Sequence, residues 1–389
     1  MTASDSAWQT RAQHLVDDLR ARGEIRSDAI AQAMATVPRH RFITGYYNGA
    51  QRIPVTPNAP SPDLLERAYS NTGIMVHLPS DPAGTPSSSS QPAVMARMLE
   101  AARLAPGMRV MEIGAGTGWN AALIAHITGE PVSSIEASPV IAAETRASLA
   151  RNAIAVTVRC GDGYHGAPDD GPFDRILVTC GIAGISPHWL AQLAPGGTIV
   201  APLAHGGLHP LAVITETTAR LVAFADFMPA TGPLYAGARP AATRLPRPAT
   251  TTIPIPALNP QTTYRDLWMY LAAHDPRTTC AAAHGTSNYS GCAVVDPTTT
   301  AAVFVRPDHL APIPGDASPA LAATTHRHIA RWRALGEPPL TTLSSQLRTT
   351  GSPSHPIFAP NAWALDAPTE PAPEQPGAPD SPVSRSAAQ

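Results

Sequence analysis

The sequence contains no lysine, and all 27 of its basic residues are arginine. A P-loop needs a phosphate-binding lysine after its glycines, so this class of nucleotide site is excluded. A Schiff-base lysine and the phosphate-binding lysine of a protein kinase are excluded for the same reason. Any nucleotide or nucleoside site in this chain must therefore work without lysine.

Other absences narrow the class of protein further. The four cysteines form no C-x-x-C pair, so neither a zinc site nor a disulfide framework is indicated. Whether Cys280 and Cys292 pair stays open, with free thiols favoured. The net charge is −2 without any basic block, so nucleic acid is not an expected partner. Because no run of about 18 apolar residues and no signal segment occurs, we expect no membrane partner and a cytoplasmic location.

The most informative segment is residues 110–118, Val-Met-Glu-Ile-Gly-Ala-Gly-Thr-Gly. It predicts a strand that ends in a carboxylate and a glycine turn, and the next apolar segment ends in another carboxylate, Glu136. This order is typical of a nucleoside pocket at the carboxyl edge of a parallel sheet. Gly114, Gly116 and Gly118 allow the backbone to approach a ligand closely. We expect Glu136 to accept hydrogen bonds from two ribose hydroxyls.

The motif favours S-adenosylmethionine over other nucleosides. A dinucleotide fold requires a small sixth residue in its glycine motif, where this chain has Trp119. S-adenosylmethionine carries no phosphate and needs no lysine. Asp162 follows a third predicted strand and is placed to accept from an adenine amino group. An ordinary Gly-Asp-Gly turn, or a glycine turn in an unrelated α/β enzyme, remains the alternative.

Strand-like and helical stretches alternate between residues 90 and 230, which predicts an α/β fold with a doubly wound, Rossmann-like sheet. Helices are expected at 119–128, 139–150 and 187–193. A fourth strand is expected at 173–179. Residues 193–200 are interpreted as a helix end, a Pro-Gly-Gly turn and a fifth strand.

The remaining segments predict N-terminal helices and a small C-terminal α+β addition. Helices are expected at 264–273 and 320–335, with short strands at 293–295 and 302–305. The predicted division is residues 1–89 for N-terminal helices and substrate-side loops, 90–239 for the S-adenosylmethionine-binding core, 240–262 for a linker, 263–366 for an accessory lobe and 367–389 for a disordered tail.

With these motifs in order, residues 8–230 resemble the protein-L-isoaspartate O-methyltransferase family. The segments that carry the resemblance are Val37–Phe42, Ser90-Gln91-Pro92, Glu112–Gly118, Glu136, Gly161-Asp162-Gly163, Pro172-Phe173-Asp174 and Leu193–Gly197. The resemblance implies a methyltransferase sheet that binds S-adenosylmethionine and no metal. The cofactor residues that it implies are Glu112, Gly114, Gly116, Gly118, Glu136, Asp162 and Gly163.

The resemblance also implies a substrate loop. Ser90 would hold the acceptor carboxylate near the reacting oxygen, with Ser88, Ser89 and Gln91 assisting. An alternative role for Ser90 is the N-cap of the helix that starts near Pro92. No general base is needed, because an aspartyl-type carboxyl with a pKa near ~4 is ionised at neutral pH.

The implied activity is carboxyl O-methylation of L-isoaspartyl or aspartyl residues in proteins or peptides, giving an ester that can cyclise to a succinimide. Two departures from the family, the serine-rich segment 86–92 and the long C-terminal continuation, keep a second substrate open. That substrate is an aspartate in a ribosomally made precursor peptide, as in a peptide-maturation subgroup of the family. A non-catalytic scaffold that binds S-adenosylmethionine is the alternative of another class. We expect a protein or peptide partner and a monomer.

Overall fold

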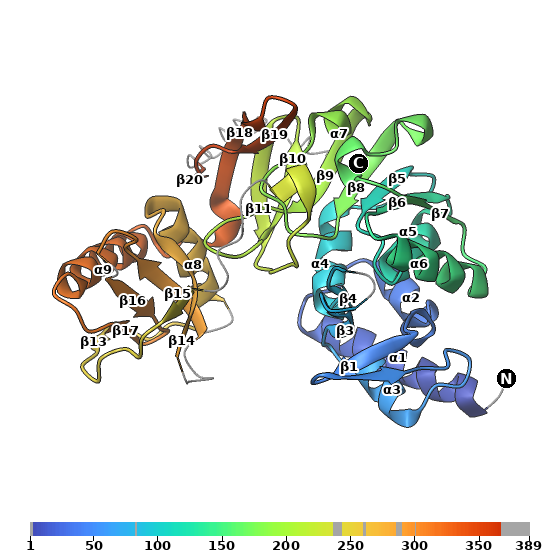
Figure 1. Cartoon of the computed structure of the whole chain (residues 1–389), viewed down its shortest axis with the longest axis horizontal. Coiled ribbons are helices and arrows are strands. Elements are labelled where there is room, and N and C mark those ends of the chain that lie inside the picture. The colour runs from blue at the N-terminus through green and yellow to red at the C-terminus, as the bar shows by residue number, and fades with distance from the viewer. Residues whose placement is uncertain are drawn as a thin grey trace, which may run out of the picture.

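The computed structural model describes residues 3–81, 84–235, 243–259, 262–284, 290–299 and 301–366. The predicted tail, 367–389, lies outside the described residues. The chain forms a large central sheet with N-terminal helices at one end and a second, smaller sheet at the other (Figure 1). The α/β fold class predicted from the sequence is confirmed. Among the described residues, no helix is both long and apolar enough to cross a membrane.

The central sheet has the strand order β19-β18-β11-β10-β9-β8-β5-β6-β7, and the strands from β9 to β7 are parallel. Its chain order reverses at β5, whose neighbours are β6 on one side and β8 on the other. Ligands bind in the crevice at such a switch point, beyond the carboxyl ends of the strands. The strands of its first part are β5 (Val110–Ile113), β6 (Val132–Glu136), β7 (Val156–Cys160), β8 (Phe173–Val178), β9 (Leu193–Pro202), β10 (Leu211–Thr215) and β11 (Thr218–Ala223).

Proline at the first turn starts three helices around this sheet and α3 in the N-terminal region, because its fixed φ suits that position and its missing N–H is not needed there. At α3 and α7 the preceding serines, Ser61 and Ser186, also accept a hydrogen bond from a backbone N–H of the first turn. The four helices are α3 (Pro62–Ala68), α4 (Pro92–Ala102), α6 (Pro139–Arg151) and α7 (Pro187–Ala191).

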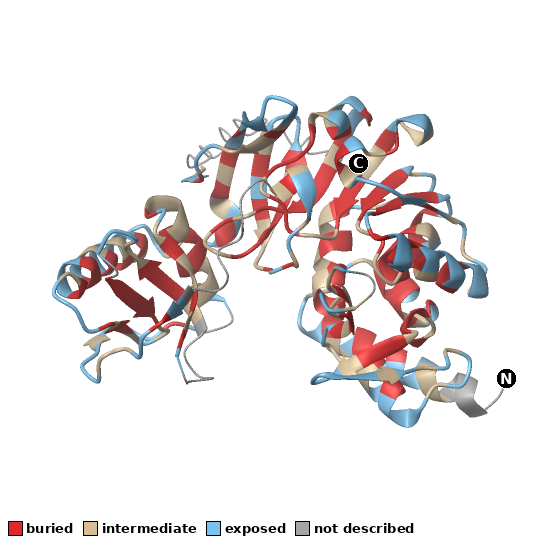
Figure 2. Ribbon diagram, viewed as in Figure 1, coloured by how far each residue is buried: buried red, intermediate tan, exposed pale blue. Residues whose placement is uncertain are grey.

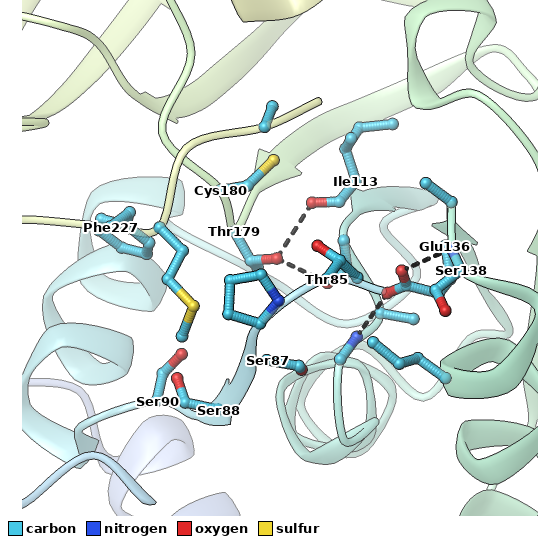
Figure 3. A pocket seen from close by; sticks show the side chains of 18 of the residues that line it. Thr85, Ser87, Ser88, Ser90, Ile113, Glu136, Ser138, Thr179, Cys180 and Phe227 are labelled. Carbon is cyan, nitrogen blue, oxygen red and sulfur yellow. Dashed lines mark hydrogen bonds between the residues drawn. The ribbon is translucent and has the colours of Figure 1, made fainter. Parts of the chain in front are cut away.

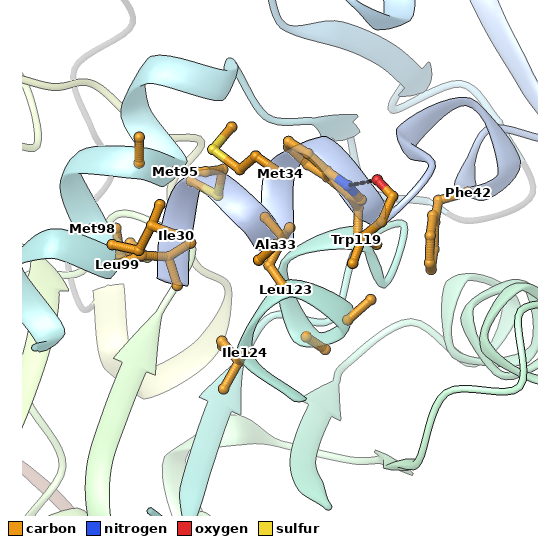
Figure 4. Packing of buried hydrophobic residues seen from close by; sticks show 14 of the residues in the cluster. Ile30, Ala33, Met34, Phe42, Met95, Met98, Leu99, Trp119, Leu123 and Ile124 are labelled. Atoms are coloured by element: carbon orange, nitrogen blue, oxygen red, sulfur yellow. Dashed lines mark hydrogen bonds between the residues drawn. The ribbon is translucent and has the colours of Figure 1, made fainter. Parts of the chain in front are cut away.

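The N-terminal region packs on the sheet through α5 (Trp119–Thr128), which is buried almost all round. Side chains of α2 (Asp28–Thr36) and α4 meet those of α5 in this core (Figure 4). Buried residues continue along the strands of the central sheet, and the exposed residues lie on the outer faces of the helices (Figure 2). The other elements of the N-terminal region are α1 (Ala3–Ala21), β1 (Gly45–Asn48), β2 (Gln51–Pro54), β3 (Ile74–His77) and β4 (Ser87–Ser89), with a 3-10 turn at Arg39–Phe42.

The second sheet has the order β12-β14-β15-β16-β17-β13 and carries two helices, α8 (Thr263–His274) and α9 (Ser318–Ala334). Apolar side chains of both helices, including Leu271 and Trp332, belong to one buried cluster with Ile199 and Leu221 of the central sheet. The hydrophobic core is therefore continuous between the two sheets. The strands are β12 (Thr243–Leu245), β13 (Ile253–Pro254), β14 (Thr278–Ala283), β15 (Ser290–Val295), β16 (Ala302–Val305) and β17 (His309–Pro312).

The structure differs from the predicted division in two places. The predicted linker, 240–262, contains β12 and β13, which form the two edges of the second sheet. Short strands and proline suit sheet edges, where no further strand needs the backbone donor. The predicted lobe, 263–366, includes three strands of the central sheet, because β18 pairs with β11. These strands are β18 (Leu343–Ser352), β19 (His355–Pro360) and β20 (Ala364–Leu365).

The interpretation of residues 193–200 was wrong at its start. The helix before this segment, α7, ends at Ala191, and β9 begins at Leu193. The register between β8 and β9 shifts after the pair Phe173 and Leu193, so residues 194–197 form an irregularity within the strand. Gly196 takes a positive φ of 75° there. The Pro-Gly-Gly turn is thus a bulge in β9 instead of a helix–strand connection.

Candidate active site

A cavity of about 600 Å³ lies at the carboxyl ends of β5, β6 and β8. Figure 3 shows Ser88 and Ser90 on one side of this cavity and Glu136 and Ser138 on the opposite side. We call residues 114–118 the glycine loop and residues 85–91 the serine loop. The two loops touch, since a Cβ on Gly116 would lie 3.7 Å from Ser87 Oγ.

The glycine loop is held by the ends of the neighbouring strands. Gly114 N donates to Ile135 O of β6 at 2.8 Å, and Thr179 Oγ1, just after β8, donates to Gly114 O at 2.6 Å. Gly114 has a φ of 95°, and a Cβ there would lie 2.5 Å from Thr179 Oγ1. Only glycine fits this position without displacing Thr179. The backbone of the loop therefore forms one wall of the cavity.

Glu136 lies at the end of β6 and lines the cavity. Its Oε2 accepts from Gly116 N and its Oε1 from Ser138 N, both at 3.1 Å. These two backbone donors fix the carboxylate, which is 8% exposed. Each oxygen has a further lone pair, so the carboxylate can still accept hydrogen bonds from a ligand.

Two of the predicted cofactor residues do not line the cavity. Glu112 is fully buried behind the glycine loop, where it accepts from Asn120 Nδ2 at 2.8 Å and from Ser134 Oγ at 2.6 Å. Burial raises the pKa of Glu112 to about 7. Gly118 is the N-cap of α5 with a φ of 87°, and a Cβ there would lie 2.9 Å from Thr145 Cγ2. The physical reason for Gly118 is close packing on α6, so it supports the loop instead of facing a ligand.

Asp162 and Gly163, which follow β7, do line the cavity. Asp162 Oδ1 accepts from Tyr164 N at 2.9 Å, which leaves the other oxygen for a ligand. A Cβ on Gly163 would lie 2.7 Å from Ile113 Cγ2 at the end of β5. The glycine therefore allows this turn to lie against the glycine loop's strand.

The serine loop divides its side chains between the cavity and the protein interior. Ser88, Ser90 and Gln91 line the cavity, whereas Ser89 is 1% exposed and accepts from Arg39 Nε at 3.0 Å. Ser89 turns toward the buried guanidinium of Arg39 instead of the cavity. Ser89 was therefore wrongly expected beside the substrate.

The alternative role of Ser90 as a helix cap is also not seen. The N-cap of α4 is Gln91, which makes no side-chain cap hydrogen bond. Instead, Asn71 Oδ1 accepts from Ala93 N at 3.0 Å, and Gln91 Nε2 donates to Asn71 O at 3.0 Å. The Ser90 hydroxyl is thus not needed by the helix.

Arg39 was noted in the sequence only as part of a motif, and the structure shows that it holds the serine loop. Its guanidinium is fully buried and lies 5.2 Å from the centre of the Trp119 ring. Burial lowers its pKa to about 9, so it remains a cation at neutral pH. It donates to Ser89 Oγ and to the backbone oxygens of Ala68, Ser70, Thr72, Ser89 and Ser90.

A further wall of the cavity, residues 226–231, was not assigned a role from the sequence. The segment follows β11 and pairs with Gly181, which donates to Met228 O and accepts from Ala230 N, both at 2.8 Å. Phe227 and Met228 bring apolar surface to the cavity, and Asp226 brings a carboxylate held by the buried His209 at 2.9 Å. The sequence signal for this wall was weak, because only Pro229 marks the turn.

The cavity is acidic and has no base of the usual kind. Glu136, Asp162 and Asp226 line it, and none of the described lining residues is arginine or histidine. Cys180 also lines it, but burial raises the pKa of this thiol to about 12, so it stays protonated. No group of three or more His, Cys, Asp or Glu suited to a metal occurs within the described part of the chain.

Comparison with known proteins agrees with this geometry. Residues 10–230 match the family model described as protein-L-isoaspartate(D-aspartate) O-methyltransferase (PCMT). A protein-L-isoaspartate O-methyltransferase of Methanopyrus kandleri is 32% identical over 221 residues, which are 56% of this chain and 87% of the relative. A Synechococcus protein of the same name is 38% identical over 205 residues, 52% of this chain and 72% of the relative.

One solved structure extends the likeness beyond the matched segment. It is titled protein-L-isoaspartate O-methyltransferase and covers 90% of this chain and 99% of its own, with a TM-score of 0.51 and 24% identity. At this identity it shows the fold alone. The shared fold therefore extends past residue 230, where the match to the family model ends.

Proposed function

This chain belongs to the protein-L-isoaspartate(D-aspartate) O-methyltransferase family, and we propose that it methylates the carboxylate of L-isoaspartyl residues in proteins or peptides with S-adenosylmethionine. One observation carries the proposal: the glycine loop with Glu136 and the serine loop with Ser90 face each other across a single cavity. A cofactor on the first side and a carboxylate on the second would meet between them. Aspartyl residues are the finer alternative for the acceptor.

The residues present fit the cofactor. A cavity of about 600 Å³ has room for a nucleoside with an amino-acid chain. Glu136 would accept from the ribose hydroxyls, Asp162 from the adenine amino group, and the glycine loop would contact the amino-acid part. The carboxylates and the lack of lining arginine suit a cation and would oppose a nucleotide phosphate. When bound, the cofactor supplies an electrophilic methyl group on a positively charged sulfur.

The chain's own residues align and shield the acceptor. Ser90 would donate a hydrogen bond to the acceptor carboxylate, which is ionised at neutral pH and needs no base. Alignment of two reactants contributes up to roughly 7–11 kcal/mol in favourable systems. Phe227 and Met228 bring apolar surface to the cavity, which would limit the access of water to a bound acceptor. In the ester product, the next backbone nitrogen can attack the acyl carbon and close a succinimide ring. The methoxy group leaves and takes the amide proton to form methanol, whereas an ionised carboxylate offers no such leaving group.

A dedicated precursor peptide is not favoured as the substrate. One of the two features that suggested it, the long C-terminal continuation, falls largely within the 90% of this chain that is covered by a solved structure titled protein-L-isoaspartate O-methyltransferase. A non-catalytic scaffold is not favoured either, because the cavity retains both the glycine loop and Ser90.

We also propose that the second sheet contributes to substrate selection. It is fixed to the central sheet by hydrogen bonds from Trp268 Nε1 to Gly206 O and between His205 Nε2 and Met269 O, both at 3.0 Å. Trp363 packs on His205 at the same boundary. Trp332 packs in the core, so tryptophans serve both the core and this boundary.

Substrate size tests this role of the second sheet. Removing everything after Met228 would also remove β18 from the central sheet and Leu234 from the cavity, so a truncation is not a clean test. Arg327 and Arg331 are exposed on α9, and a double substitution to alanine should lower kcat/KM for folded proteins but not for a hexapeptide. If the variant has the same kcat/KM as the wild type for the folded protein as well as for the hexapeptide, the second sheet does not contribute to substrate selection in this way.

The activity itself is tested with two peptides of identical composition, one with an L-isoaspartyl residue and one with aspartyl. We expect labelled methyl groups to enter the isoaspartyl peptide and to leave as volatile methanol on treatment with base. Base-stable label, or no transfer to either peptide, would contradict carboxyl methylation. Preference for the aspartyl peptide would show that the acceptor is an aspartyl residue, and carboxyl methylation would still hold.

A further inference from the structure

Among the described lining residues, Asp226 is the carboxylate that has no role in the proposed cofactor site. Its side chain is 39% exposed and lines the cavity, so a molecule in the cavity can reach it. The other lining carboxylates, Glu136 and Asp162, are assigned to the ribose and the adenine. The charge of Asp226 is therefore expected to act on the acceptor substrate instead.

The segment that carries Asp226 begins on the serine-loop side of the cavity. Phe224 O accepts from Arg97 Nη1 at 3.3 Å, and Arg97 belongs to α4, the helix that follows the serine loop. Figure 3 shows Phe227 on the same side of the cavity as Ser90. Asp226 lies between Phe224 and Phe227 in the chain, which places it on the proposed acceptor side.

The buried ring of His209 fixes the Asp226 carboxylate. His209 is 1% exposed, and a Cβ on Gly181 would lie 2.5 Å from its ring, so the ring packs closely against the backbone there. Its Nδ1 lies 2.9 Å from Asp226 Oδ1, and its Nε2 lies 3.4 Å from Tyr235 Oη. With its proton on Nδ1, the ring donates to Asp226 and accepts from Tyr235. His209 thus holds the cavity wall at two points.

The charge of Asp226 would discriminate between substrates. A carboxylate on the acceptor side repels an acidic neighbour of the isoaspartyl residue and attracts a basic one. No lining arginine or histidine among the described residues offsets this charge, so the compensating cation is expected from the substrate. On the basis of the proposed carboxyl methylation, we propose that Asp226 selects substrates with a basic side chain next to the isoaspartyl residue, and that His209 is its positioning residue.

The test measures kcat/KM of the full chain with L-isoaspartyl hexapeptides that differ at one position. In one set the residue before the isoaspartyl residue is lysine, glutamine or glutamate, and in a second set the residue after it is varied in the same way. In at least one set, the wild type should favour the lysine peptide over the glutamate peptide by about fivefold, which is what a partly exposed ion pair contributes. This preference should shrink as the salt concentration rises, because salt screens exposed charges.

Variants assign the preference to Asp226 and His209. Asp226→Asn removes the charge but keeps an oxygen that His209 can reach, so the preference for the lysine peptide should disappear. Asp169→Asn is the matched control, because Asp169 is an exposed acid that does not line the cavity, and the preference should be unchanged. His209→Phe keeps a ring without the donor and should weaken the preference, whereas His209→Asn, whose amide can donate in place of Nδ1, should restore most of it. A purely structural role of His209 would leave the preference unchanged in both variants.

The outcomes separate this inference from the proposed function. If no isoaspartyl peptide is methylated, including those with glutamine, the proposed function is wrong and the inference falls with it. If the wild type methylates the lysine and glutamate peptides of both sets equally, or if Asp226→Asn keeps the full preference, Asp226 does not select the substrate while carboxyl methylation stands. If Asp226→Asn does not fold, a preference that is independent of salt or unchanged in His209→Phe contradicts the inference in the same way.

Discussion

The two sides of the cavity are built by different physical means. Backbone hydrogen bonds at the ends of the parallel strands hold the glycine loop. Gly114 N donates to Ile135 O at 2.8 Å, and Thr179 N donates to Ile113 O at 2.9 Å. The serine loop lies outside the parallel sheet: its β4 pairs only with the short strand β3, and the buried guanidinium of Arg39 donates to Ser89 and Ser90. The comparison shows that the glycine loop, on the proposed cofactor side, is held by the large parallel sheet, whereas the serine loop, on the proposed acceptor side, is held by a two-stranded pair and by side chains, above all Arg39. The two sides should therefore respond to different substitutions.

The largest effect is expected from Arg39→Met. The substitution leaves several buried carbonyl oxygens without a donor, each worth about 1–3 kcal/mol, so we expect the free energy of unfolding to fall by roughly 3–5 kcal/mol. Urea unfolding measures the change. In the molecules that remain folded, turnover should fall more than the affinity for S-adenosylhomocysteine.

Two variants control for charge and for position. Arg39→Lys keeps the charge without the planar fork of donors and should be intermediate. Arg41→Met removes a neighbouring, partly exposed arginine and should change stability little. If Arg39→Met were as stable and as active as Arg41→Met, the acceptor side would not depend on Arg39.

Glu112→Gln should change how stability depends on pH. The pKa of Glu112 is raised from 4.5 to about 7 by burial, so its contribution to stability is complete below pH 4.5 and is lost as the pH rises to about 7. The loss is roughly 3 kcal/mol for this shift, since one pKa unit corresponds to about 1.4 kcal/mol. Glutamine does not titrate, so the difference between wild type and variant should grow in favour of the variant across this window. A difference independent of pH would show that the carboxyl is not perturbed as described.

Glu136→Ala should weaken cofactor binding and leave the serine loop unchanged. Losing hydrogen bonds to a charged acceptor should weaken S-adenosylhomocysteine binding by about 1.5–3 kcal/mol, measured by calorimetry. Glu130→Ala, an exposed acid just before the same strand, is the control and should bind as the wild type does. Unchanged affinity in Glu136→Ala would contradict the proposal that Glu136 accepts hydrogen bonds from the ribose hydroxyls.

The sequence predicted the cofactor side better than the acceptor side, for the same physical reason. The glycine loop, Glu136 and Asp162 follow successive strands, and a parallel sheet brings the carboxyl ends of its strands to one edge. Arg39 reaches the serine loop across about fifty residues of sequence, and no local pattern shows such a contact. Whether Ser89 faces the cavity or Arg39 depends on how β4 pairs with β3, which the serine run does not define.

Two other features needed the structure for similar reasons. Glu112 and Glu136 look equivalent in the sequence, but only the packing of Asn120 and Ser134 shows that Glu112 lies behind the loop. Residues 343–365 follow the second sheet in the chain, yet β18 pairs with β11 of the central sheet. Sequence order alone assigned these strands to the wrong neighbours.

Ser90→Ala is expected to have the smallest effect, but it tests the central claim most directly. That claim is that Ser90 donates a hydrogen bond to the acceptor carboxylate. Turnover of an isoaspartyl peptide and the affinity for S-adenosylhomocysteine are measured on the same preparation. A single hydrogen bond made at the reacting centre predicts a fall in kcat of about tenfold, with the affinity unchanged. Full turnover in Ser90→Ala, or a loss of cofactor affinity as large as that of Glu136→Ala, would contradict the account.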